Sequence, residues 1–194
     1  MAVDRPALAI FDRPTDHQPA RELVRIADTD DVATDNCPDC GHVLDEHDRD
    51  QRFTLPEPML HVHQPVPAED VWMSGSDVRD SELLQVQRIG TFVRATLPVD
   101  LTGGYRITFG VWLLVDPAEF QLICEAWWGP GYSQLRIEGY LANEIPPWGM
   151  LASPVDAIVK DPEKLPVCVA SAVPLLDRVL REQSSHEVTL GSIH

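Results

Sequence analysis

Two strand-like segments separated by only three residues constrain the fold more than any other feature. Residues 83–87 and 91–99 are rich in apolar side chains and flank Arg88-Ile89-Gly90. A connection this short joins neighbouring strands as an antiparallel hairpin. A third apolar segment, 105–115, follows a turn at residues 100–104. These segments therefore predict strands in meander order and argue against a nucleotide-binding α/β fold.

A helix start follows the third strand directly. Asp116 occupies the capping position, Pro117 the first helical position, and Glu119 stands three residues after the cap. The pattern predicts a helix over residues 117–128. One apolar face would carry side chains at helical spacing, namely Phe120, Ile123, Cys124 and Trp127. We therefore expect Cys124 to be a core thiol, and we expect the same of Cys168 between apolar neighbours.

The rest of the chain completes an α+β fold with a mainly antiparallel sheet, two packed helices and an N-terminal CxxC knuckle. Further predicted elements are a strand at 59–63, strands at 134–141, 155–159 and 166–170, and a final helix at 174–183. The predicted organisation is a mobile N-terminal arm over residues 1–30, a single domain over 31–185 and a C-terminal tail over 186–194.

The charge of the chain restricts its partners. The 194 residues include 31 acidic and 15 basic side chains, a formal net charge of -16. Such a surface repels phosphate backbones and anionic lipids, so we expect neither nucleic-acid nor membrane binding. Acidic residues are dense over 28–57, which is typical of a solvated face or of a surface that docks a basic protein. The sequence thus favours a protein partner, and a basic one.

No apolar stretch reaches the 18 or more residues of a membrane span, and none resembles the core of a signal peptide. We therefore expect a cytoplasmic protein. In that compartment, the four cysteines are expected as thiols or metal ligands rather than disulfides.

The sequence CPDCG at residues 37–41 has the spacing of half a zinc site. Cys37 and Cys40 would aim two thiolates at one ion, and Gly41 permits the tight turn of a knuckle. A structural site needs two more ligands. His61 and His63 would share one face of the predicted strand and complete the set, with His47 as a competitor. His42 and Asp45 are further candidates.

Three other functions are compatible with parts of this pattern. A site with only three protein ligands would suit a metal-assisted hydrolase, because a water could occupy the fourth position. A reversible dithiol is disfavoured, since the surrounding acids would raise the thiol pKa. An acidic inhibitor or toxin-neutralising protein would use the charge alone. The chain lacks GxSxG, HExxH and phosphate-binding GxxxxGK motifs, which favours a binding or regulatory protein over an enzyme.

Several motifs, taken in order, resemble the bacterial family catalogued as domain of unknown function 2199. They are CPDCG, Ser81-Glu82-Leu83, Phe92-Val93-Arg94, Phe109-Gly110-Val111-Trp112, the helix start from Asp116 to Phe120, and the segment from Gly139 to Pro146. The resemblance would cover about residues 35–180 and implies no reaction. The chain departs from the family where Glu82-Leu83-Leu84 replaces Asp-Leu-Cys and Val173-Pro174-Leu175 replaces His-Pro-Leu. Arg94 and Asn143 stand at positions that match the family. Both could have structural roles, in which Arg94 would pair with an acid and Asn143 would cap a turn.

Overall fold

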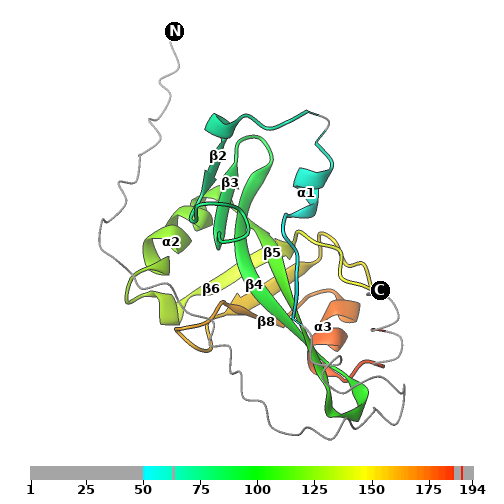
Figure 1. Cartoon of the computed structure of the whole chain (residues 1–194). Helices are drawn as coiled ribbons and strands as arrows, with labels where there is room; N and C mark the ends of the chain where they lie inside the picture. The colour runs from blue at the N-terminus through cyan, green and yellow to red at the C-terminus, as the bar shows by residue number, and fades with distance from the viewer. Residues whose placement is uncertain (1–49, 63, 186–188, 190–194) are drawn as a thin grey trace, which may run out of the picture. The chain divides into compact units, whose positions relative to one another are not determined.

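A computed structural model describes residues 50–62, 64–185 and 189 (Figure 1). The strands in this part of the chain are β1 (Asp50–Arg52), β2 (Val71–Met73), β3 (Leu83–Val86), β4 (Gly90–Asp100), β5 (Arg106–Val115), β6 (Arg136–Leu141), β7 (Pro154–Ile158) and β8 (Val167–Ala170). The α-helices are α1 (Glu57–Leu60), α2 (Pro117–Trp127) and α3 (Pro174–Arg181), and the 3-10 helices are η2 (Ala68–Asp70), η3 (Thr102–Gly104) and η4 (Tyr132–Gln134). The described structure is therefore mostly sheet.

Five of the strands close into a barrel. The sheet order is β1-β5-β6-β7-β8-β4-β3-β2, and β4 also pairs with β5. The strands β4, β5, β6, β7 and β8 consequently form a ring. On the outside of this ring, β1 adds to β5 in parallel, while β3 and β2 extend the sheet from β4. The prediction of a sheet with packed helices is confirmed, the predicted N-terminal CxxC knuckle lies outside the described residues, and the barrel closure was not predicted.

The long strand β4 has a hydrophobic core on each of its two faces. Its odd-numbered residues from Val93 to Val99 face the main core, where they meet side chains of α2 and α3. Phe92 faces the other way and packs with Trp112 in a smaller core beside β3. The two helices lie well apart along β4 (Figure 1). This alternation follows from the pleat, which directs successive side chains to opposite faces of a strand.

The predicted helices and core cysteines agree with the structure. Asp116 caps α2 by accepting a hydrogen bond from the backbone N–H of Ala118 at 2.8 Å. Cys124 is half-buried on this helix and packs against the main core. Cys168 is buried in β8. Burial raises the pKa of Cys124 to about 11, with a further contribution from the charge of Glu125, and raises that of Cys168 to about 12.

The predicted strand at 59–63 is wrong. Met59 and Leu60 belong to helix α1, and His61 ends that helix with φ -99° and ψ 4°. The alternation of residues 59–63 suggested a strand, but Pro58 lies in the first turn of the helix, where a fixed φ and a missing N–H are tolerated. His61 therefore lacks the strand geometry that would have paired it with His63.

Within the described residues, no helix is both long enough and apolar enough to cross a membrane. The predicted arm at 1–30 lies outside the described residues, so the domain boundaries stay a prediction.

Candidate functional site

An open groove of about 550 Å³ lies where β5 gives way to α2. The start of β4, the end of β5, the first turn of α2, the middle of β6 and the start of β7 line it. Its apolar lining residues include Leu114, Val115, Gly139 and Pro154. Tyr140 is 52% exposed and adds an aromatic side chain. The groove therefore combines an apolar lining with access from solvent.

Four exposed acidic residues line the same groove, and no lysine or arginine does. They are Asp116, Glu119, Glu138 and Asp156. Glu138 and Asp156 are direct cross-strand neighbours on β6 and β7. Like charges placed opposite each other destabilise a strand pair by about 0.2–1 kcal/mol. Over the part of the chain that the structure describes, none of these four residues forms an ion pair, and Arg136 lies on the same solvated face of β6 as Glu138.

Gly139 permits the close approach of strands that shapes the groove. A Cβ atom at this position would lie 2.8 Å from the carbonyl oxygen of Leu114 and 3.2 Å from Cγ1 of Val115. Real side chains do not tolerate such a contact with backbone, so only glycine lets β6 cross β5 here. By itself Gly139 contributes no binding group.

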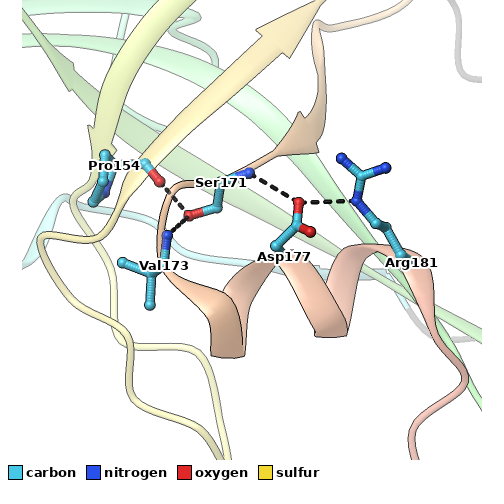
Figure 2. A network of polar contacts seen from close by, with 5 residues as sticks. All are labelled: Pro154, Ser171, Val173, Asp177 and Arg181. Carbon is cyan, nitrogen blue, oxygen red and sulfur yellow. Dashed lines mark hydrogen bonds and ion pairs between the residues drawn. The ribbon is translucent and has the colours of Figure 1, made fainter.

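A polar network fixes the β7 side of the groove (Figure 2). The Ser171 hydroxyl donates to the carbonyl of Pro154, the first residue of β7. The same oxygen accepts from the N–H of Val173 at 3.0 Å, and the N–H of Ser171 donates to Asp177 Oδ1 at 3.4 Å. Arg181 Nε lies 2.9 Å from that carboxylate, and its hydrogen bond lowers the pKa of Asp177. These hydrogen bonds hold the start of β7 next to the start of α3.

The network also satisfies a backbone donor at the start of α3. Val173 precedes α3 and has no side chain able to cap it. The Ser171 hydroxyl accepts the Val173 N–H instead, which satisfies a backbone donor at the helix start.

A buried arginine on β4, away from the groove, binds backbone carbonyls of two other segments. Arg94 is fully buried and donates from Nη1 to the carbonyl of Phe53 at 2.6 Å, from Nη2 to that of Thr54 at 3.2 Å, and from Nε to that of Ser81 at 3.2 Å. Its guanidinium carbon lies 4.1 Å from the ring centroid of Trp112, a cation–π distance. The expected acid pairing is wrong, because these direct partners are carbonyls.

Burial lowers the pKa of Arg94 to about 9, and the charge of Arg52 lowers it further, whereas that of Glu82 raises it. The side chain is still protonated at neutral pH. A buried cation without a bonded carboxylate depends on its carbonyl partners for solvation.

Two further side chains bind the same segment. Asn143 accepts from the Trp112 backbone N–H and donates to the carbonyl of Leu55, both at 2.8 Å. Trp112 Nε1 donates to the carbonyl of Thr54 at 3.2 Å. Asn143 therefore bridges β5 to residues 53–55 rather than capping a turn. We call Arg94, Trp112 and Asn143 the carbonyl clamp, because together they bind three successive carbonyls.

One of the predicted metal ligands is described. His61 is exposed, and its Nε2 lies 3.3 Å from Glu57 Oε1. Cys37, Cys40, His47 and His63 lie outside the described residues. Over residues 50–62 and 64–185, no group of three or more histidine, cysteine or acidic side chains is placed to hold a metal. The zinc ligands therefore stay a prediction.

The groove residues were missed at the level of sequence. Arg136, Glu138 and Tyr140 alternate with apolar residues, which is the signature of a strand with one solvated face. That signal could have identified an outward-facing Glu138. The register that sets Asp156 opposite it could not be read from either strand alone.

Residues 36–167 match the model of a family described as an uncharacterized protein conserved in bacteria, DUF2199. The chain belongs to this family. The DUF2199 match includes positions 37 and 40, the carbonyl clamp and both strands that carry Glu138 and Asp156. Four of the motifs that carried the resemblance meet at the clamp, through Ser81, Arg94, Trp112 and Asn143. Neither the curated proteins nor the solved structures compared with this chain gave a match.

Proposed function

We propose that this DUF2199 protein is a binding protein that docks a basic segment of another protein in the acidic groove. The observation that carries the proposal is the groove lining, which has four carboxylates and no basic side chain. A cation placed between Glu138 and Asp156 would offset the repulsion between them. Two acids placed opposite each other at a cost in stability are typical of a binding surface.

The remaining lining supports the same ligand chemistry. Tyr140 presents an exposed ring next to the acidic pair, since its cross-strand neighbour Pro154 adjoins Asp156 in the register. Aromatic faces attract ammonium and guanidinium groups. The apolar part of the groove can accept the aliphatic stems of lysine and arginine. The net charge of -16 would speed the approach of such a partner at low salt.

We also propose that Cys37 and Cys40 supply two ligands of a structural zinc ion, with the others drawn from His47, His61 and His63. The support is the CPDCG spacing. The carbonyl clamp also supports this proposal. Its three side chains bind residues 53–55, which follow the cysteine pair in the sequence. A segment fixed at that point is a suitable anchor for a small zinc knuckle.

Neutralising the acidic pair should weaken the binding of a basic peptide. The probe is a fluorescein-labelled octapeptide of alternating lysine and threonine, measured by anisotropy with the full chain at low ionic strength. We expect Glu138→Gln with Asp156→Asn to lower affinity at least about tenfold at low ionic strength, because two charge contacts with the basic peptide are lost. The same variant should be about 0.5 kcal/mol more stable to urea, since the cross-strand repulsion is removed.

The matched control is Glu69→Gln with Glu125→Gln. Both residues are exposed, neither lines the groove, and the change in net charge is identical. If this control weakens the peptide as much as the groove variant does, attraction to the overall negative charge explains binding and the docking proposal fails.

Metal analysis tests the zinc proposal. Protein made under reducing, metal-replete conditions should contain about one zinc per chain, and Cys37→Ser with Cys40→Ser should contain almost none. Cys124→Ala serves as the control and should keep its metal. After chelation, Cys37 and Cys40 should react quickly with a thiol reagent at pH 8. Cys124 and Cys168 should react slowly, because their raised pKa values of about 11 and 12 leave few thiolates.

Protein without zinc under those conditions would reject the knuckle. Zinc that survives in the double variant would reject these two ligands.

A further inference from the structure

The outward face of β6 carries an apolar row that continues onto both neighbouring strands. Tyr140 pairs with Leu114 on β5 and with Pro154 on β7, so these three side chains lie side by side on one face of the sheet. All three line the groove, where Tyr140 is exposed and the other two are half-buried. We call Leu114, Tyr140 and Pro154 the apolar row.

A second row, two residues further along each strand, is acidic. Glu138 pairs with Asp156, and both are exposed. Asp116 follows Leu114 by two residues and keeps an extended backbone, with φ -62° and ψ 140°, so the pleat directs its side chain to the same face. Its carboxylate caps α2 and also lines the groove. We call Asp116, Glu138 and Asp156 the acidic row, which lies about 7 Å from the apolar row.

A basic residue limits the width of the acidic row. Arg136 is exposed on the same face of β6, two residues beyond Glu138, and pairs with Ile158. A ligand cation placed there would be repelled. The ligand therefore needs a basic stripe only one side chain wide, with its apolar side chains on the side away from Arg136.

An α-helix lying across the strands meets these requirements. Neighbouring members of the acidic row are about 5 Å apart across the sheet, and one helical turn advances about 5.4 Å. Basic residues at i, i+4 and i+7 of a helix therefore fall over the three acids. An apolar residue directly after each basic one is rotated by about 100° and forms a second stripe about 8 Å away. That separation matches the distance between the two rows.

We propose that the basic partner presents an amphipathic α-helix, which lies across β5, β6 and β7 with its basic stripe on the acidic row and its apolar stripe on the apolar row. This inference rests on the proposed function and specifies the form of the docked segment. Tyr140 is already paired along both edges of β6, with Leu114 and with Pro154, so the ligand lies on the outward face rather than beside the strand. Amphipathic helices bind apolar grooves through side chains at this spacing.

Two alanine-based peptides of about 15 residues test the match to both rows. The first has lysines at i, i+4 and i+7, each followed directly by a leucine. The second moves each leucine one position further, which places the leucines on the opposite side of the helix without changing composition or charge. By anisotropy with the full chain at low ionic strength, we expect the first peptide to bind at least about tenfold more tightly, because only its two stripes contact both rows at once.

Two further changes test the helix and its position. A proline in place of a central alanine, on the side away from both stripes, should weaken the first peptide at least about tenfold, because proline breaks a helix interior. In the protein, Tyr140→Thr should reduce the difference between the first two peptides to within about threefold, because it removes the centre of the apolar row. Unchanged affinity of the proline peptide, or an unchanged difference in the Tyr140 variant, would overturn the helical docking.

Other outcomes separate this inference from the proposed function. Equal affinity for the first two peptides, with binding still sensitive to Glu138→Gln with Asp156→Asn, would overturn the helical docking and leave the acidic groove intact. Binding of the lysine–threonine octapeptide without binding of the first helical peptide would do the same. Failure of every one of these peptides to bind would overturn both proposals.

Discussion

Replacing Arg94 with methionine is expected to lower the free energy of unfolding by about 3–5 kcal/mol. Methionine keeps an unbranched stem that can pack on Trp112, but it removes every donor of the guanidinium. The carbonyls of Phe53 and Ser81 would then lose their side-chain donor in a buried site. Each unsatisfied buried group costs about 1–3 kcal/mol. Urea denaturation monitored by tryptophan fluorescence measures the loss.

Arg136→Met is the matched control for this change. Arg136 is exposed on β6, outside the clamp, and its replacement should alter stability by no more than about 0.5 kcal/mol. Arg94→Lys should fall between the two, because one ammonium group keeps the charge but cannot reproduce the planar fork of donors. An Arg94→Met protein as stable as the unmodified one would show that the carbonyl contacts contribute nothing net.

The second large effect is expected at Asn143. Asn143→Leu leaves the buried N–H of Trp112 without an acceptor and the carbonyl of Leu55 without a donor. We expect stability to fall by about 2–4 kcal/mol. Hydrogen exchange should show faster opening of residues 53–57 than of the barrel strands, because this segment depends on side-chain contacts. Uniform destabilisation across both regions would contradict a local role for the clamp.

Asn143→Asp separates the two hydrogen bonds of this side chain. A carboxylate still accepts from Trp112 but cannot donate to Leu55, whereas a protonated carboxyl can do both. Burial should raise the folded-state pKa of the new aspartate above its unfolded value of about 3.9. The added stability is then present below that unfolded value and is lost as the pH rises through the folded one. The variant should approach the stability of the unmodified protein in acid and diverge from it near neutrality.

The sequence predicted the local elements well and the candidate site poorly. Asp116-Pro117 located the start of α2, and Arg88-Ile89-Gly90 located the hairpin, because caps and short turns act within a few residues. The strand at 59–63 failed where an alternation over five residues competed with Pro58. Arg94 was noticed, but its carbonyl partners were not, since they come from segments 13 to 41 positions earlier in the chain.

The sequence by itself determined most of the long strands, the helices α2 and α3, the packing of Cys124 and Cys168 against the core, and the strong negative charge. Only the tertiary structure decided the barrel closure, the placement of Glu138 opposite Asp156, and the groove where β5 gives way to α2. The physical reason is the range over which each effect acts. Backbone preferences and side-chain periodicity are set by near neighbours, whereas strand register is set by packing between segments far apart in the chain.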